Sequence, residues 1–360
     1  MNKQVWRLTW QRHKWLVIIA AILMILYAGR AVQRLQTDYH TDVKYTMTPA
    51  KFHKDLQRPK DKRWTDKTTY TAYLHESLDQ FSSATDTDSN MMANYISNSP
   101  QGISYLFMGA IFVLGLLASG WDHYNRFDRF IFASGIKRSR YYWTRTNLYL
   151  ALVVVGSTLS FLAIRFASTL IIPAKYNVMT GQQLFGATLL NVVFATSAFA
   201  LGYLFALLCG RLWLLPVLSI ASFYCMDIMF ENVTLMLGKP STAIFDPTIP
   251  GKYYWFVLTA FVVAAIFCLL VGAWGYRHVS AETLSLALVV SKLQPLAILI
   301  GMVVGFFVLP RYTTSSNRYL SWFQPAPLIV LALGLIWHFW PQILRTVRQL
   351  VQKRQQLKTL

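Results

Sequence analysis

The stretch that decides the fold occupies residues 148–172 and reads LYLALVVVGSTLSFLAIRFASTLII. Its one charged residue is Arg165. Roughly 20 consecutive apolar residues in a helix cross the ~30 Å hydrocarbon core of a bilayer. Lipid offers no hydrogen-bonding partner to an open backbone, so a segment that crosses it must be helical or part of a closed barrel. Residues 148–172 therefore predict a membrane-spanning helix.

Similar apolar blocks recur along the chain, and nearly all the charge lies between them. Of the 360 residues, 55% are hydrophobic and only 14% are charged, which is more apolar than a typical soluble domain. The pattern predicts an all-α polytopic membrane protein with about eight transmembrane helices. These are expected at residues 15–29, 103–121, 148–172, 184–209, 212–230, 253–276, 295–309 and 325–340. The first, seventh and eighth are short and need flanking residues to span.

The distribution of Lys and Arg predicts the orientation. With the N-terminus inside, the cytoplasmic segments hold 18 Lys and Arg against three acidic residues, whereas residues 30–102 hold ten against nine. Because cytoplasmic loops of membrane proteins are enriched in Lys and Arg, we expect both termini in the cytoplasm of a multi-pass cell-membrane protein. The first span is expected to be an uncleaved anchor. This bias also accounts for the net charge of +19, so no nucleic acid partner is expected.

The composition divides the chain into five parts. Residues 1–29 form a basic amphipathic segment and the first span, and residues 30–102 form a small, polar, mainly helical extracytoplasmic domain. In this domain Leu74, Leu78 and Phe81 share one face of a helix predicted over 71–82. The remaining parts are a core at 103–276 with a cytoplasmic loop at 122–147, a linker with two additional spans at 277–340, and a basic amphipathic cytoplasmic tail at 341–360.

The motifs of common enzymes are missing or incomplete. The nearest string to a phosphate-binding loop is Gly238-Lys239-Pro240-Ser241, which lacks the first glycine and the hydroxyl residue after lysine. His123 and Asp128 have the HxxxxD spacing of some acyltransferases, but no supporting glycine or proline motif follows them. The three cysteines all lie in apolar blocks, so no disulfide framework or metal site is expected. We therefore expect no catalytic residue, no metal site and no enzyme.

The loop at 122–147, DHYNRFDRFIFASGIKRSRYYWTRTN, is the most informative connection. Its pattern predicts a short helix over 125–133 that Gly135 ends, followed by a basic cluster. Such a helix suits docking to a soluble partner. The alternative is a solvated interfacial helix, because positive-inside loops are basic in any membrane protein.

The layout resembles the permease subunit of ATP-binding-cassette exporters of the type-2 superfamily. The resemblance covers roughly residues 1–285: a basic amphipathic start (MNKQVWRLTWQRHKW), a first span, a large outer loop, a second span and a turn of the form SGIKRSRYYWTR. The family core usually has six spans, whereas this chain adds two. The resemblance implies a coupling helix that inserts into a groove of the ATPase. The residues it assigns to that contact are Asp128, Phe130, Ile131, Gly135, Lys137, Arg138 and Arg140.

The resemblance implies that the chain is the permease subunit of an ATP-driven exporter for a hydrophobic or amphipathic substrate. Its partners would be a cytoplasmic ATP-binding-cassette ATPase, a second permease copy or homologue, and the lipid bilayer. ATP and magnesium would bind the partner ATPase, and this chain would hold no cofactor. The alternative is a non-transporting membrane sensor or assembly protein whose extracytoplasmic domain binds a ligand.

Two further features concern charge near or within the membrane. Arg165 lies in the third span, and we expect it to pair with Asp227 or Glu231 in the fifth, because an unpaired charge at that depth is costly. At the N-terminus, cations recur with the spacing of one helix face, and Trp6, Trp10 and His13 lie on another. This pattern predicts a helix in the membrane interface, or an ordinary basic flank of the first span.

Overall fold

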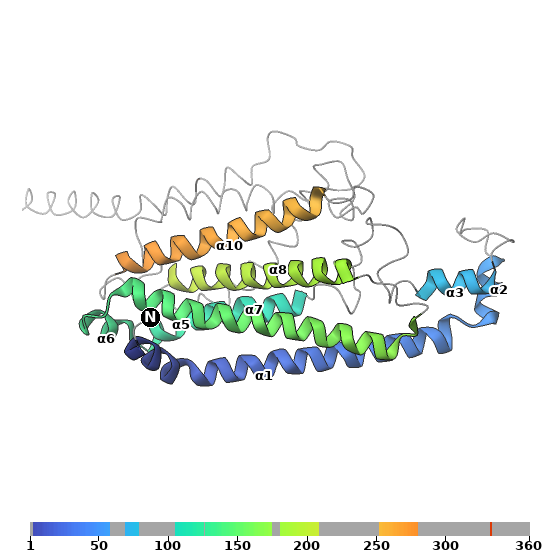
Figure 1. The fold of residues 1–360 in the computed structure, drawn as a ribbon, viewed down its shortest axis with the longest axis horizontal. Coiled ribbons are helices and arrows are strands. Elements are labelled where there is room, and N and C mark those ends of the chain that lie inside the picture. The colour runs from blue at the N-terminus through green and yellow to red at the C-terminus, as the bar shows by residue number, and fades with distance from the viewer. Residues whose placement is uncertain are drawn as a thin grey trace, which may run out of the picture. The chain divides into compact units, whose positions relative to one another are not determined.

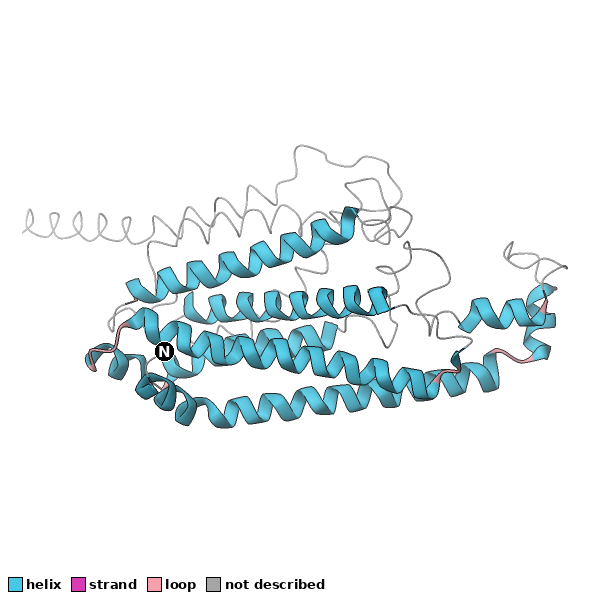
Figure 2. Ribbon diagram, viewed as in Figure 1, coloured by secondary structure: helices cyan, strands magenta, loops and turns pink. Residues whose placement is uncertain are grey.

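The computed structural model describes residues 3–57, 69–78, 105–125, 127–174, 181–208 and 252–279, together with Ala332. Within these residues the regular structure is helical, without a strand (Figure 2). The chain divides into two compact units, and Met1–Leu207 with Thr242–Arg277, the first unit, contains nearly all of the described residues. Apart from Ala332, the spans predicted at 212–230, 295–309 and 325–340 and the tail at 341–360 lie outside the described residues.

Four of the described helices are long and apolar enough to cross a membrane. They are α1 (Lys3–Thr41), α7 (Arg138–Ile171), α8 (Gly181–Leu208) and α10 (Lys252–His278). Helix α5 (Tyr105–Tyr124) is apolar over the shorter stretch Leu106–Asp122. For the described residues, the predicted all-helical, membrane-embedded character is therefore confirmed.

Helix α1 is longer than the predicted first span. It continues through Gly29 to Thr41, and its 39 residues give a length of about 58 Å, nearly twice the hydrocarbon thickness of a bilayer. Its last turns are helical because they pack: Leu35 and Tyr39 are buried in a cluster with Ile172, at the end of α7. The boundary expected after residue 29 is thus a change of composition within one helix.

Helix α7 begins ten residues before its predicted start at residue 148. The additional turns are polar in sequence, so hydropathy places them in the loop. In the structure Tyr141, Tyr142 and Arg145 are all fully buried. Burial of these polar side chains extends the helix into the region that the sequence assigns to the cytoplasmic loop.

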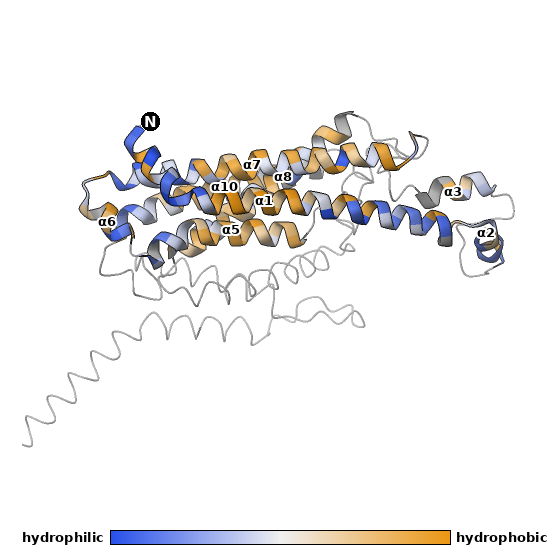
Figure 3. Ribbon diagram, turned by 90° about the horizontal axis from the view of Figure 1, so that it is seen from below, coloured by the Kyte–Doolittle hydropathy of each residue, from blue (hydrophilic) through white to orange (hydrophobic). Residues whose placement is uncertain are grey.

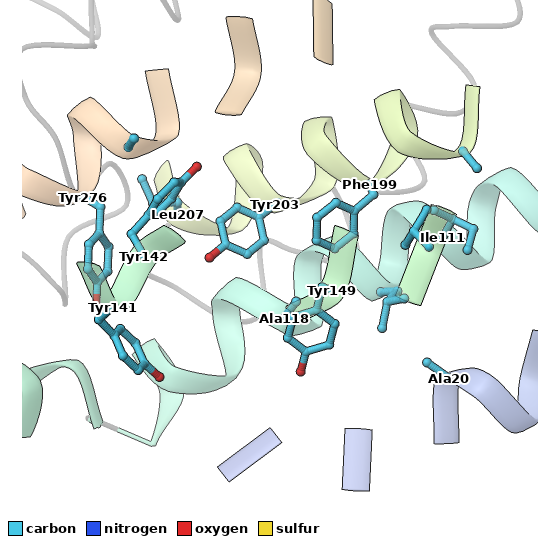
Figure 4. Close-up of a cluster of buried hydrophobic side chains, with 14 of the residues drawn as sticks. Ala20, Ile111, Ala118, Tyr141, Tyr142, Tyr149, Phe199, Tyr203, Leu207 and Tyr276 are labelled. Carbon is cyan, nitrogen blue, oxygen red and sulfur yellow. The ribbon is translucent and has the colours of Figure 1, made fainter. Parts of the chain in front are cut away.

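Helices α1, α5, α7, α8 and α10 lie side by side and share one core (Figures 1 and 3). Figure 4 shows that core, to which each of the five helices contributes a labelled side chain. The short helix α6 (Phe127–Ala133) and the N-terminus lie at one end of this bundle, and α2 (Pro49–Leu56) and α3 (Tyr70–Leu78) lie at the other (Figures 1 and 3). Helix α1 therefore runs from the α6 end of the bundle to the α2 end.

Helices α2 and α3 form a small cluster of their own. The Thr48 hydroxyl caps α2 by accepting from the backbone N–H of Lys51 at 3.3 Å. The Phe52 ring lies 5.5 Å from the Tyr70 ring and 5.1 Å from the Tyr73 ring. Aromatic packing thus accompanies helix formation in part of the polar segment. The helix predicted over 71–82 is observed as far as Leu78, the end of α3, and residues 79–82 lie outside the described residues.

Helices α5 and α8 cross at two glycines. A Cβ atom on Gly115 would collide with the backbone carbonyl of Phe199, and one on Gly202 would collide with that of Phe112. The absence of side chains at both positions lets the two backbones approach closely, as small residues commonly do between membrane helices.

We expect Gly115→Ala and Gly202→Ala each to destabilise the protein by roughly 1–3 kcal/mol, because the new methyl meets backbone that cannot rotate away. Thermal unfolding of the purified protein measures this as a lower Tm. Gly29→Ala in α1 is the matched control, since nothing lies within 4 Å of its Cβ position. Equal Tm values for all three variants would contradict the close crossing.

Candidate functional site

The short helix α6 and the turn after it have the structure expected from the sequence. The helix ends at Ala133, and the Ser134 N–H donates to the Phe130 carbonyl at 2.9 Å. Gly135 follows with φ of +72°, in the left-handed region that glycine enters without steric strain. The chain then reverses into α7. The predicted short helix with a glycine at its end is therefore confirmed.

The residues assigned to a partner contact divide into an exposed and a buried group. Phe130 is 55% exposed, and Gly135, Lys137 and Arg140 are also exposed. These four residues are hereafter the coupling face. They present one large apolar ring and two cations at the end of the bundle.

Asp128 and Ile131 belong to the buried group, so their assignment as partner-contacting residues is corrected. Both are fully buried in the structure. The Tyr276 hydroxyl donates to Asp128 Oδ1 at 2.6 Å, and Ile131 packs into the core that Tyr276 also joins. Because α6 is amphipathic, one side faces the bundle and only the other is open to a partner.

Arg138 occupies an intermediate position and also links helices. It is half-buried, and its Nη1 donates to the backbone carbonyl of Arg277 at 3.2 Å. This contact joins the start of α7 to the end of α10. Arg138 therefore holds the turn after α6 in place as well as bordering the coupling face.

Beside α6, the Asp122 carboxylate at the end of α5 is the centre of a buried polar network. Arg145 Nη1 donates to Asp122 Oδ2 at 2.7 Å, and the Tyr141 hydroxyl donates to the same oxygen at 2.6 Å. His13 Nε2 lies 3.2 Å from this oxygen, and Arg12 Nε lies 3.6 Å from Oδ1. Asp122, His13 and Arg145 are fully buried.

The Arg145 guanidinium sits among tyrosine rings. Its Nε donates to the Tyr203 hydroxyl at 2.7 Å, and its Cζ lies 5.4, 5.2 and 5.5 Å from the ring centroids of Tyr141, Tyr203 and Tyr276. Ring faces attract cations, and the attraction grows where water is excluded. Figure 4 shows these three tyrosines in the core, where they come from α7, α8 and α10.

His13 brings α1 into the network through both ring nitrogens. Nε2 faces Asp122, and Nδ1 lies 2.9 Å from the Tyr149 hydroxyl. The His13 and Tyr149 rings meet edge to face, with centroids 5.6 Å apart. One imidazole thus bridges α1, α5 and α7.

The buried polar network indicates which role this end of the bundle can have. A buried ion pair is held only if its geometry and its further hydrogen bonds offset the desolvation of both charges. Here one pair joins α5 to α7, while His13, Tyr203 and Tyr276 add α1, α8 and α10. Among the described residues no group of three or more His, Cys, Asp or Glu could hold a metal ion. The geometry therefore fits a mechanical connection between helices.

Of the predicted intramembrane charge pair, only Arg165 lies among the described residues. Arg165 is buried in α7, and its Nη1 donates to the Ser168 hydroxyl at 3.2 Å. Asp227 and Glu231 lie outside the described residues, so the pairing stays a prediction.

Sequence reasoning missed His13, Asp122 and Arg145 as a unit. It placed His13 on one face of an interfacial helix and Arg145 in the cytoplasmic loop at 122–147. The available signal was the recurrence of tyrosines at 141, 142 and 149, whose rings and hydroxyls can accommodate a buried cation.

We expect Asp122→Asn to destabilise the protein by roughly 3–5 kcal/mol, because it leaves the buried Arg145 without a counter-charge. Arg145→Gln should behave similarly, and the double variant should lose clearly less than the sum of the two. Urea unfolding of the three variants measures the coupling. Asp38→Asn, in the exposed pair with Arg34, is the control and should cost about 0.3–0.5 kcal/mol. Strictly additive losses at Asp122 and Arg145 would contradict the pair.

Comparison with known proteins identifies no relative of this chain. No family model, curated protein or solved structure matches the chain. A functional assignment therefore rests on the α6 end of the bundle and on the charge pattern of the sequence.

Proposed function

We propose that this chain is the permease subunit of an ATP-driven exporter that moves a hydrophobic or amphipathic substrate across the membrane. A separate ATP-binding-cassette ATPase would supply the energy, and a second permease copy or homologue would complete the transporter. The observation that carries the proposal is the coupling face, which lies at the end of the bundle on α6, on the turn after it and on the start of α7. The other side of α6 is anchored in the core.

The composition of the coupling face favours a protein partner. An exposed phenylalanine next to Lys137 and Arg140 combines apolar area with positive charge. Aromatic residues and arginine are enriched in protein interfaces relative to the rest of a protein surface. The ring of Phe130 would enter an apolar pocket of the ATPase, and the cations would face carboxylates around that pocket.

The anchoring beneath α6 explains how a force on it would reach the membrane helices. Asp128 connects α6 to α10 through Tyr276, and Asp122, a few residues before α6, connects α5 to α7 through Arg145. Packed helices and salt bridges move as discrete units when an interface repacks. Closure of the ATPase would displace α6, and these contacts would carry the displacement to the ends of the spans.

The proposal includes a topology. The coupling face and both termini would be cytoplasmic, and α2 and α3 would belong to an extracytoplasmic domain between the first two of about eight spans in a bacterial cell membrane. The Lys and Arg excess in the segments assigned to the cytoplasm supports this orientation. The position of α6 and α2 at opposite ends of the bundle is consistent with it (Figure 1).

The sensor or assembly protein is the rival proposal. The aromatic cluster of Phe52, Tyr70 and Tyr73 would then be the functional part, as a small folded domain that binds a ligand. This rival needs no ATPase, so co-purification separates the two proposals.

We expect the full-length tagged chain, purified from membranes of its native host, to bring down a protein with ATPase activity. Lys137→Glu combined with Arg140→Glu should reduce the recovered activity at least tenfold, because it reverses the charge of the coupling face. The recovered activity is measured as phosphate release per mole of tagged chain.

Arg30→Glu combined with Lys54→Glu is the control, since it makes the same charge change on exposed residues at the other end of the bundle. It should leave the activity unchanged. Equal Tm values for both variants would show that folding is preserved. Absence of ATPase activity with the unaltered chain, or its full retention after charge reversal, would exclude the coupling role and favour the rival.

A further inference from the structure

The first turns of α1 carry an exposed row of cations. Lys3 and Arg7 are exposed and Lys14 is half-buried, and their spacing of four and seven residues places them on one helix face. These three residues are hereafter the basic stripe. The same turns bury Val5 and His13, so the basic stripe points away from the bundle core.

The charge of the basic stripe is not compensated within the described part of the chain. The sequence has no acidic residue before Asp38. The two described carboxylates at this end of the bundle, Asp122 and Asp128, are buried, the first bonded to Arg145 and the second to Tyr276. No described carboxylate lies within ion-pair distance of Lys3, Arg7 or Lys14. This surface of α1 therefore presents charge of a single sign.

Arg12 behaves differently from its neighbours. Its Nε lies 3.6 Å from Asp122, and its guanidinium lies 4.8 Å from the centroid of the Phe127 ring. Arg12 thus belongs to the buried network, and the basic stripe is a separate feature of the same helix.

Two tryptophans mark the depth of the basic stripe. Trp10 is 40% exposed and Trp15 is 67% exposed, and Lys14 Nζ lies 5.6 Å from the Trp15 ring centroid. Tryptophan is enriched at the headgroup level of membranes. A cation next to such a ring is therefore at the depth where lipid phosphates lie.

Beyond Trp15 the exposed face of α1 becomes aliphatic. Ile18, Ile22 and Ile25 are 40%, 49% and 70% exposed, with spacing that continues the face of the basic stripe. Figure 3 shows the resulting change on α1 from hydrophilic near the N-terminus to hydrophobic further along. One helix face thus passes directly from cations to hydrocarbon-compatible side chains, with tryptophan between them.

We propose that the basic stripe is a binding site for anionic phospholipid, with Lys3, Arg7 and Lys14 contacting headgroup phosphates of the bilayer. Charge complementarity supports this occupant, because anionic lipid attracts basic segments next to a span. A lipid surface also satisfies the aliphatic continuation of the same face, which a soluble anion would leave uncovered. The site is independent of the coupling face and of the proposed export activity.

Native mass spectrometry of the detergent-solubilised full-length protein, titrated with phosphatidylglycerol or phosphatidylcholine, tests the proposal. We expect preferential binding of phosphatidylglycerol that weakens when the ionic strength is raised. The triple variant Lys3→Gln, Arg7→Gln, Lys14→Gln should bind phosphatidylglycerol about a hundredfold more weakly, at about fivefold per cation. Its affinity for phosphatidylcholine should not change.

The matched control is Arg30→Gln, Arg34→Gln, Lys54→Gln, which removes three exposed cations at the other end of the bundle and should keep the affinity for phosphatidylglycerol. Equal binding of the two lipids by the unaltered protein would overturn the proposal, even if the triple variant failed to fold. Equal weakening in both variants would also overturn it. Unchanged lipid binding with loss of the co-purified ATPase would instead assign the basic stripe to a protein partner.

Discussion

The arrangement of helices at the α6 end depends on one buried carboxylate. Asp122 ends the apolar helix α5, and its charge must be matched because bulk water does not reach it. Arg145 supplies that match at 2.7 Å, and this requires the first turns of α7 to continue inward as helix. The guanidinium in turn contacts Tyr203 of α8 and Tyr276 of α10. His13 connects α1 to the same carboxylate. Contacts of Asp122 and of its partner Arg145 thus link all five helices at this end of the bundle.

This constraint separates anchoring from recognition in α6. Asp128 and Ile131 hold the helix to the bundle, and the opposite side carries Phe130 with the cations that follow Gly135. A protruding helix without such anchors would absorb a push by local bending. With them, displacement of α6 would shift the ends of the helices to which it is bonded, as the proposed coupling role requires. The basic stripe on α1 is a second surface at this end, suited to lipid phosphates.

Much of the fold could be predicted from the sequence because bilayer chemistry acts on local composition. Apolar length predicted α8 and α10 closely, and Gly135 with the pattern before it predicted α6. The network could not be predicted in this way, since His13 and Asp122 are 109 residues apart and their contact is a property of packing. The same limit explains why the early start of α7 was not predicted. Hydropathy scales rank arginine as strongly polar and favour a solvated position for it, whereas Arg145 is buried. Asp128 and Ile131 were misassigned because the sequence does not show which side of α6 the bundle covers.

In the proposed topology, α6 faces the compartment that contains ATP, on the opposite side of the membrane from α2. Cysteine accessibility tests it directly in a full-length chain whose three native cysteines are replaced by alanine. Single cysteines are introduced by Lys137→Cys beside α6 and by Lys54→Cys in α2, and intact cells are treated with a membrane-impermeant maleimide. We expect labelling of the Lys54→Cys chain in intact cells, and labelling of the Lys137→Cys chain only after permeabilisation. Labelling of the Lys137→Cys chain in intact cells would contradict it.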